Sequence, residues 1–299
     1  MYKIFVIGSS NTDMVIQSVK HPKPGETVLG SNFMINPGGK GANQAVAAAR
    51  LGAHVTLVAK LGDDLFGHQA VEHFKKEQID TQYISFEPSQ PSGVALITVD
   101  AKGENTIVVA AGANQFLLKT EIDLVAESFQ SGDFALFQLE IPIETVQYGI
   151  KKATEKGVKC VLNPAPAQAL SDEILYGLFA ITPNESETAL LTGVEVTDID
   201  SAEKAAQILV KKGVKHVIIT LGEQGALYVS QTQKFHVSAP KVKAVDTTAA
   251  GDCFNGALVL ALSEGKDWKS SLEFACLAAS KSVQKLGAQS SMPYKNDVK

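Results

Sequence analysis

Short apolar runs alternate with longer amphipathic stretches along most of the chain. The first apolar run covers residues 3–8, and a polar segment at 9–13 follows it. Further strand-like runs lie at 55–59, 134–138, 159–163, 179–182 and 216–221, with helical stretches such as 144–156 and 202–212 between them. This alternation predicts an α/β fold with a mostly parallel central sheet flanked by helices on both faces. Because such sheets bind ligands at the carboxyl ends of their strands, we expect the functional residues at that edge.

Two segments have a different pattern, that of β-hairpins. Alternating runs at 14–17 and 27–36 flank a Pro- and Gly-containing turn, and runs at 92–100 and 105–110 flank a second turn with glycine. We predict that these four strands, within 14–36 and 92–110, form a small sheet inserted in a single domain that spans 1–299. Such a sheet buries little by itself, so we expect it to act as a lid over a substrate and as the surface of a homodimer.

Composition and charge narrow the class of partner. The chain has 299 residues, of which 45% are apolar and 20% are charged, as expected for a globular protein with a substantial core. It carries 27 basic and 32 acidic residues, a formal net charge of −5, and no run of more than two Lys or Arg. The sequence therefore predicts small-molecule partners and no nucleic-acid surface.

Cysteine usage and the N-terminal pattern indicate a cytoplasmic protein. Cys160, Cys253 and Cys276 are scattered and form no C-x-x-C pair, which favours a reducing compartment over a disulfide framework or a zinc site. The first apolar run is too short for a signal peptide, and no apolar span reaches membrane length, so we expect no membrane association. The six histidines are also scattered, and none has the spacing of a metal ligand.

The strongest candidate chemistry lies at 245–257. An apolar, strand-like run ends at Val245, the small residues Ala249, Ala250 and Gly251 follow, and 254–262 has the pattern of a buried helix. The unpaired N–H groups and the dipole at the start of a helix bind anions, and small residues let a phosphate approach. Asp252 lies among these donors, where it is either a helix-capping carboxylate or a general base beside a phosphoryl group. The local sequence leaves both interpretations open.

A glycine-rich stretch at 38–44 precedes a helix predicted at 45–51. It is not a Walker A loop, because Lys40 is followed by Gly41, and it is not a dinucleotide fingerprint, because Gln44 stands at the third glycine position. We expect Gly39 and Gly41 to let the backbone approach a polyhydroxyl ligand, and Asn43 to offer it a donor and an acceptor.

Other polar residues follow the predicted strands, and each has an ordinary structural interpretation. Asn11 and Asp13 fit turn chemistry, and Glu140 fits a surface acid before a proline. Asn184 with Glu187 fits a helix cap, and the Gly-x-x-Gly turn after Thr220 fits a β-hairpin. The Pro-rich segment 163–167 is interpreted as a rigid structural turn.

Two of these motifs carry a resemblance to a known family. The segments D-T-T-A-A-G-D-C-F-N-G-A at 246–257 and G-G-K-G-A-N-Q at 38–44 resemble the two signatures of the ribokinase, or PfkB, family of carbohydrate kinases, in the family's order, and the similarity runs from the first strand to Pro293. The resemblance implies a ribokinase-like three-layer sandwich. It also implies transfer of the γ-phosphoryl group of ATP to the 5-hydroxyl of D-ribose, with Asp252 as base and Ala249, Ala250 and Gly251 as N–H donors.

The same resemblance implies the binding residues. The sugar would contact Asn11, Asp13, Gly39, Lys40, Asn43, Glu140 and Asp252. ATP would contact Asn184, Thr220, Gly222, Gly225, Gly251 and Cys276, and Glu187 would organise the water shell of Mg²⁺. Mostly through backbone carbonyls, K⁺ would be enclosed by Asp246, Thr248, Ser282, Lys285, Gly287 and Ser291. The family often has glycine where this chain has Ala249, and a backbone that needs a positive φ would be disfavoured there.

Three alternatives remain. A related kinase of the family would act on deoxyribose, fructose or a nucleoside, although the 38–44 stretch resembles the ribose-specific members more than the nucleoside kinases. A Rossmann dehydrogenase would need the missing dinucleotide fingerprint. A sugar-binding regulator without activity would not need Asp252 beside an intact anion site.

Overall fold

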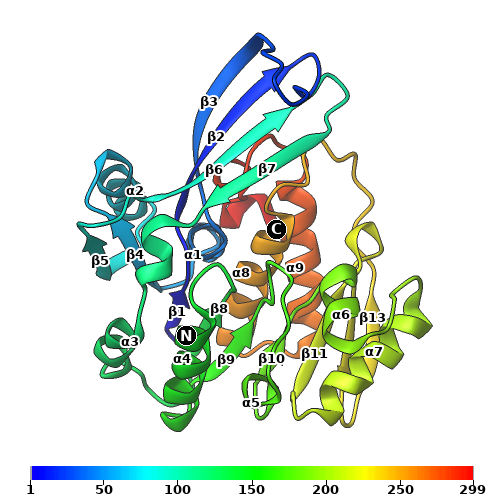
Figure 1. The fold of residues 1–299 in the computed structure, drawn as a ribbon. Coiled ribbons are helices and arrows are strands. Elements are labelled where there is room, and N and C mark those ends of the chain that lie inside the picture. The colour runs from blue at the N-terminus through cyan, green and yellow to red at the C-terminus, as the bar shows by residue number, and fades with distance from the viewer. Residues whose placement is uncertain (1, 299) are drawn as a thin grey trace.

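The computed structural model describes residues 2–298, and its centre is a nine-stranded sheet (Figure 1). From one edge to the other, the strand order is β13-β12-β11-β10-β9-β8-β1-β4-β5. Neighbours from β5 to β11 are parallel, and only β12 and β13 are antiparallel. The strands are β1 (Ile4–Ile7), β4 (Val55–Gly62), β5 (Asp80–Glu87), β8 (Phe134–Phe137), β9 (Lys159–Leu162), β10 (Ala180–Ile181), β11 (His216–Thr220), β12 (Ala226–Ser230) and β13 (Lys234–Val237). The predicted mostly parallel sheet is confirmed.

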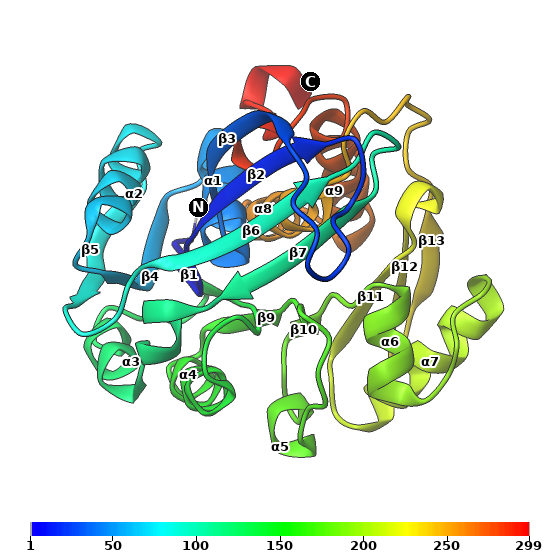
Figure 2. The ribbon, with the colours of Figure 1, turned by 45° about the horizontal axis from the view of Figure 1, so that its top comes forward.

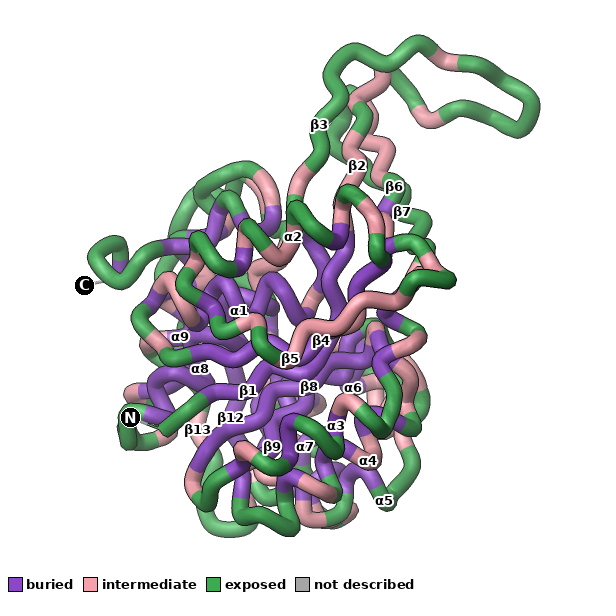
Figure 3. Tube along the Cα trace, turned by 90° about the vertical axis from the view of Figure 1, so that its left-hand side faces the viewer, coloured by how far each residue is buried: buried purple, intermediate pink, exposed green. Residues whose placement is uncertain are grey.

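Helices cover both faces of this sheet, as predicted, and the alternation within β1 shows why. Ile4 and Val6 point into one apolar core, and Phe5 and Ile7 point into the other. The first core packs against α1 (Lys40–Arg50), α2 (Leu65–Lys76), α8 (Ala250–Ser263) and α9 (Trp268–Ser282). The second packs against α3 (Lys119–Ala126), α4 (Ile143–Glu155), α5 (Asp172–Leu175), α6 (Glu185–Thr192) and α7 (Ile199–Lys211). Both cores lie in the buried centre of the trace in Figure 3.

A four-stranded sheet projects from this sandwich (Figure 1) and crosses in front of it in the view of Figure 2, which confirms the predicted separate sheet. Its order is β3-β2-β6-β7, with β2 (Asn11–Ser18) parallel to β6 (Gly93–Val99). β3 (Gly30–Gly38) and β7 (Asn105–Ala110) complete the two hairpins. The outer part of this sheet is exposed (Figure 3) and displays the large apolar side chains Ile16, Phe33, Met34, Ile35, Leu96, Ile107, Val108 and Val109.

Two local predictions were wrong. The segment 9–13 is not a loop throughout, because Asn11 already pairs with Gly38 and Gly93 at the start of β2. The predicted strand ending at Val245 does not form: 238–249 contains no strand, and the Val245 N–H donates to the Val283 carbonyl instead of a neighbouring strand.

Both helices at the candidate site begin earlier than predicted, α1 at Lys40 instead of 45 and α8 at Ala250 instead of 254. Glycine has low helix propensity, so the sequence pattern hides these first turns. In the described part of the chain, four 3₁₀ segments complete the fold, namely η1 (Gly112–Phe116), η2 (Gly222–Gln224), η3 (Gln289–Ser291) and η4 (Lys295–Val298). Within residues 2–298, no helix is both long and apolar enough to cross a membrane.

Candidate active site

The first turn of α8 is open, in the sense that some of its backbone N–H groups have no acceptor among the described residues. Its N-cap residue, Ala249, has φ 59° and ψ 17°, the left-handed conformation that was expected to be disfavoured for alanine, at a cost of roughly 1–2 kcal/mol. The Ala250 N–H donates to the Thr247 carbonyl at 3.2 Å, so one of the three predicted donors is partly engaged. The N–H groups of Gly251 and Asp252 have no acceptor within residues 2–298. Unpaired donors at a helix start favour an anion.

The space beside this turn is also open, and α8 is held close to α1. A Cβ atom added at Gly251 would meet no atom within 4 Å, whereas one at Gly256 would lie 2.7 Å from the Gln44 carbonyl oxygen of α1. The glycine at 256 therefore lets the two helices approach, and the glycine at 251 leaves room in front of the open donors.

Asp252 lies buried between these helices. Its Oδ2 accepts a hydrogen bond from Asn43 Nδ2 and its Oδ1 accepts one from Gln44 Nε2, both at 2.9 Å. The carboxylate therefore faces the side chains of α1 and does not cap its own helix, which rules out the capping interpretation. Burial raises the pKa of Asp252, while Lys40 and the two amides offset part of that rise. A raised pKa suits a general base, which must take up a proton near neutral pH.

The first turn of α1, in contrast, is filled by the protein. Its N-cap residue, Gly39, has φ 88°. The Lys40 N–H donates to Glu140 Oε2 at 2.9 Å, and the N–H groups of Gly41 and Ala42 donate to the side chain and carbonyl of Ser9.

The glycines of this turn admit neighbouring backbone. A Cβ atom at Gly39 would lie 2.6 Å from the Asn11 nitrogen, and one at Gly41 would lie 2.6 Å from the Ser9 nitrogen. The two glycines let α1 pack against the chain that leaves β1. Their expected approach to a ligand stays a prediction.

Three carboxylates act on one ammonium group at the site, that of Lys40. Burial alone would lower the pKa of Lys40, but Asp252, Glu140 and Glu187 together raise it, so the ammonium is held charged. Burial, with repulsion from Glu140 and Asp252, raises the pKa of Asp13 to about 7. The site thus concentrates negative charge around Lys40, an arrangement that cations and hydroxyl donors can stabilise.

Asn11 and Asp13 lie where the small sheet meets the sandwich. Asn114 Nδ2 donates to Asn11 Oδ1 at 2.8 Å and fixes the orientation of that amide. The Asp13 carboxylate lies against Gly38, where an added Cβ would come within 2.3 Å of both carboxylate oxygens. Both side chains therefore belong to β2 at its base, beside the start of α1.

Asn184 caps α6, as the sequence pattern predicts. Its Oδ1 accepts from the Glu187 N–H at 2.8 Å, and Glu187 Oε2 accepts from the Asn184 N–H at 2.9 Å. Burial raises the pKa of Glu187, and repulsion from Asp252 and Glu185 adds to the rise. The capping interpretation is confirmed, and the capping carboxylate is buried near enough to Asp252 to be repelled by it.

The Gly-x-x-Gly turn lies in a hairpin between β11 and β12, again as predicted. Gly222 and Gly225 have φ of 53° and 99° and carry the short 3₁₀ turn after Thr220. Cys276 is buried in α9 against the first core, and burial raises the pKa of its thiol to about 12. This thiol is therefore a neutral packing group.

The loop before α8 and the loop after α9 lie side by side. Asp246 Oδ1 accepts from the Thr248 N–H at 2.9 Å, and its Oδ2 accepts from the Gly287 N–H at 2.8 Å. The Lys285 N–H donates to the Ser282 carbonyl, and the Ser291 hydroxyl donates to the Ala288 carbonyl. The structure brings together the two segments predicted to enclose a cation. Within residues 2–298, no cluster of three or more His, Cys, Asp or Glu side chains forms a metal site.

Sequence reasoning missed several buried amides at the site. Gln44 bonds Asp252 and also donates to Asn163 Oδ1 at 3.0 Å, so the turn interpreted as purely structural supports the site. Gln138 Nε2 donates to Gln44 Oε1, and Gln289 Nε2 donates to Asn43 Oδ1 at 3.1 Å. Gln44 could have been found, since it lies next to Asn43 in a motif already selected.

Comparison with known proteins places this geometry in a family. Residues 1–295 match the sequence pattern of the pfkB family of carbohydrate kinases. The chain belongs to this family of carbohydrate kinases.

Its relatives include enzymes for two pentoses. The ribokinase of Haemophilus influenzae is 46% identical over 98% of this chain and 95% of its own length. The deoxyribokinase of Salmonella typhi is 40% identical over 97% of this chain and 95% of its own length. Among solved structures, the Arabidopsis thaliana ribokinase complexed with ribose and ATP matches with a TM-score of 0.92 and 31% identity, over 99% of this chain and 97% of that one. The predicted ribokinase-like sandwich is confirmed.

Proposed function

We propose that this protein transfers the γ-phosphoryl group of ATP to the 5-hydroxyl of D-ribose and so forms D-ribose 5-phosphate. The observation that carries the proposal is the buried Asp252 carboxylate, which is held by two amides of α1 beside the open first turn of α8. The relatives named ribokinase support ribose as the substrate.

In this reaction Asp252 accepts the proton of the 5-hydroxyl while the oxygen attacks the γ-phosphorus and ADP leaves. The N–H groups of Ala249, Ala250 and Gly251, with the Lys40 ammonium, offset the charge on the transferring group. A positioned base contributes about 10²- to 10⁴-fold, and one such donor contributes about 10²- to 10³-fold. Because Ala250 also donates to Thr247, the Gly251 N–H is the stronger candidate of the two.

The sugar would lie between the base of the small sheet and the start of α1. Asn11, Asp13, Asn43 and Glu140 offer amide donors and carboxylate acceptors there, the groups that recognise a polyhydroxyl compound. The backbone at Gly39 completes this wall.

The nucleotide would lie on the far side of the open turn. Asn184 and the turn of Thr220, Gly222 and Gly225 would bind it, with Cys276 packed nearby. Glu187 suits a site for the water shell of Mg²⁺, since its buried carboxylate has a raised pKa that a nearby cation would offset. When bound with ATP, Mg²⁺ neutralises phosphate charge.

The donor set beside α8 fits a monovalent cation, because it consists of carbonyl and carboxylate oxygens on two adjoining loops. We assign K⁺ to Asp246 and Thr248 of the loop before α8, to Ser282 at the end of α9, and to Lys285, Gly287 and Ser291 beyond it. Such an ion would hold the loop that leads into the open turn.

We further infer that the chain is one domain whose small sheet serves as a lid and as a homodimer surface. The exposed apolar side chains of that sheet support this inference, since a monomer would leave them in water. The three cysteines are buried and free, which supports a cytoplasmic location.

The proposal is tested by ATP consumption with ribose, 2-deoxyribose, fructose and adenosine, in Mg²⁺ with K⁺ or Na⁺ varied. We expect ribose to be preferred and its turnover to rise with K⁺. Deoxyribose is the sharpest competitor to test, because a relative named deoxyribokinase is 40% identical, and a site that bonds the 2-hydroxyl would reject deoxyribose by roughly 10⁴-fold. Preference for another sugar would refute ribose and leave the role of Asp252 intact.

A further inference from the structure

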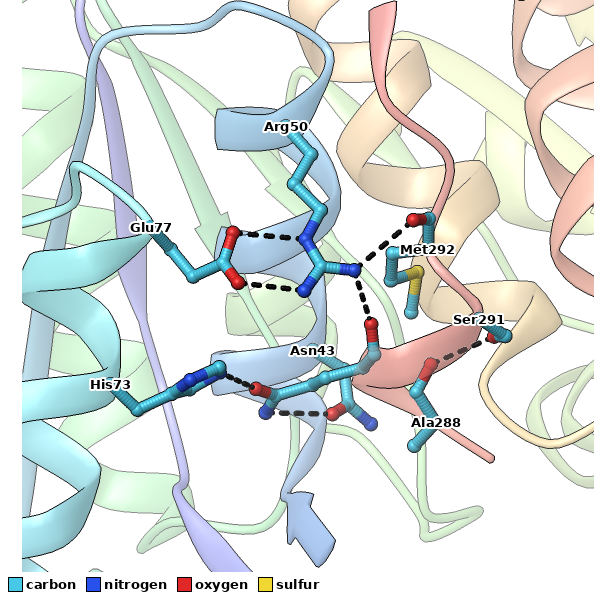
Figure 4. A network of polar contacts seen from close by, with 8 residues as sticks. Asn43, Arg50, His73, Glu77, Ala288, Ser291 and Met292 are labelled. Carbon is cyan, nitrogen blue, oxygen red and sulfur yellow. Dashed lines mark hydrogen bonds and ion pairs between the residues drawn. The ribbon is translucent and has the colours of Figure 1, made fainter. Parts of the chain in front are cut away.

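A chain of side-chain hydrogen bonds runs from Asp252 to the surface of α2. Asn43 Nδ2 donates to Asp252 Oδ2, and Gln289 Nε2 donates to Asn43 Oδ1 at 3.1 Å. Gln289 Oε1 in turn bonds His73 Nε2 at 2.8 Å (Figure 4). Gln289 is almost fully buried, so each of its contacts replaces a contact with water. Four side chains from four segments of the chain are thereby linked.

The donor and acceptor roles along this series follow from the charge of the Asp252 carboxylate. An ionised carboxylate only accepts, so Asn43 must turn its Nδ2 toward Asp252 and its Oδ1 toward Gln289. Gln289 must then turn its Nε2 toward Asn43, which leaves its Oε1 to face His73, and His73 must carry a proton on Nε2. Each group has only one orientation that satisfies both of its neighbours.

The backbone of Gln289 is held by hydrogen bonds, as is its side chain. Arg50 Nη1 donates to the carbonyl oxygens of Gln289 and Met292 at 2.6 and 3.1 Å (Figure 4). The same guanidinium forms two hydrogen bonds with Glu77, at 2.6 and 2.9 Å, in the paired geometry that orients both groups. Gln289 is therefore held from both sides, although it lies in the short η3 segment.

We propose that Gln289 is a positioning residue that sets the orientation of the Asn43 amide, and through it the hydroxyl pattern that the sugar site accepts. With Asp252 and Gln289 bound, Asn43 retains one N–H and one Oδ1 lone pair for a ligand. A reversed amide would turn a carbonyl oxygen toward the Asp252 carboxylate. The proposal rests on the sugar kinase function proposed above, in which Asn43 contacts the substrate.

A double-mutant cycle between positions 289 and 43 tests this role. Gln289→Glu keeps the size of the side chain but places a carboxylate against Asn43 Oδ1. We expect kcat/KM for ribose to fall about 10- to 100-fold, with KM for ATP changed less than about twofold. In an Asn43→Ala background, the same substitution should cost less than about threefold, because of the contacts made by Gln289 Nε2 only the long one to the Gly38 carbonyl, at 3.5 Å, remains. Gln69→Glu, an exposed change on α2, controls for the added charge.

Equal losses in both backgrounds would overturn the proposal, since a role that only holds the chain at 289–292 would not depend on Asn43. If the Gln289→Glu variant fails to fold, two variants at His73 test the proposal instead. His73→Leu removes the donor to Gln289 and should lower kcat/KM for ribose, and His73→Gln, which retains a donor, should restore it. Equal activities of the two variants would refute the series.

Failure of the proposed function is distinguished by assaying the wild-type protein first. If another sugar is preferred, the cycle is measured with that sugar. If no sugar reacts, the side-chain amide signals of Asn43 in ¹⁵N NMR replace the assay, and Gln289→Glu should shift them while Gln69→Glu should not. Unmoved Asn43 signals would overturn the positioning role.

Discussion

The helices α1 and α8 have similar N-termini in sequence, but the N–H groups of their first turns differ: those of α1 are bonded by the protein, and two of those of α8 are not. Each has an N-cap residue with positive φ, Gly39 at 88° and Ala249 at 59°, and neither has a side-chain cap. At α1 the first N–H groups donate to Glu140 and Ser9, and added Cβ atoms would meet backbone at 2.6 Å. At α8 two N–H groups have no acceptor within residues 2–298, and Gly251 faces open space.

The difference separates two uses of a glycine-rich helix start. A filled turn brings elements together and contributes to stability, whereas an open turn keeps its dipole and donors for a ligand. Sequence motifs of similar composition can therefore have opposite functions. The decisive observation is what lies in front of the N–H groups.

The largest effect is expected at the carboxylate that joins the two helices. Asp252→Asn should lower kcat by about 10²- to 10⁴-fold, because an amide cannot take up the proton of the sugar hydroxyl. Ribose binding, measured by calorimetry, should persist. Asp63→Asn, at an exposed acid, serves as the control. An unchanged kcat would remove Asp252 from the role of base.

Alanine at the two glycines should separate stability from activity. Gly41→Ala places a methyl group 2.6 Å from the Ser9 nitrogen and should destabilise the fold by about 1–3 kcal/mol or more. Gly251→Ala should raise the thermal midpoint, since alanine favours helix, while kcat/KM for ATP falls about 10-fold or more as the methyl group enters the open space. Thermal melts and steady-state kinetics of both variants check this. Full activity in Gly251→Ala would show that no phosphate approaches there.

The carboxyl group beside the filled turn should titrate near neutrality. Because burial, Glu140 and Asp252 raise the pKa of Asp13 to about 7, kcat/KM for ribose should rise with pH and level off above about 7. The raised pKa also destabilises the fold as pH rises from 3.8 to about 7, so Asp13→Asn should melt above wild type at pH 8 and lose that advantage near pH 4. A pH-independent difference in melting would contradict the shifted pKa.

The smallest effect is expected at the N-cap of α8. Ala249→Gly relieves a left-handed alanine and should stabilise the protein by about 0.5–1 kcal/mol, measured by the denaturant midpoint. Ala250→Gly, one residue later and inside the helix, should instead destabilise it by up to about 1 kcal/mol. The same sign for both variants would mean that Ala249 carries no strain.

Much of the fold could be predicted, because apolar periodicity reports which faces are buried. Most strands of the main sheet and the two hairpins follow from that signal, but β5 and β13 at the sheet edges were not predicted. The starts of α1 and α8 could not, since Gly41 and Gly251 oppose helix in the sequence and only packing overrides them. The strand predicted to end at Val245 does not form, because the Val245 N–H donates to the Val283 carbonyl after α9 and not to a neighbouring strand.

The chemistry at the site was predicted from two motifs and their resemblance to a family. The supporting amides were not, because hydrogen bonds between distant residues leave no periodic signal. Gln289 bonds a residue 246 positions away, and Asn163 bonds one 119 positions away. Such partners become visible only in three dimensions.

The hydrogen bonds from Asn43 and Gln44 to Asp252 also limit how early this site can fold during synthesis. Their partner lies 209 and 208 residues further on, so at about 5–20 residues per second the ribosome needs roughly 10–40 s to supply it. Until then, two amides destined for burial must stay hydrated, and α1 cannot dock against its neighbour. The contact between α1 and α8 at the candidate active site is thus among the last to form during synthesis, although α1 is made early.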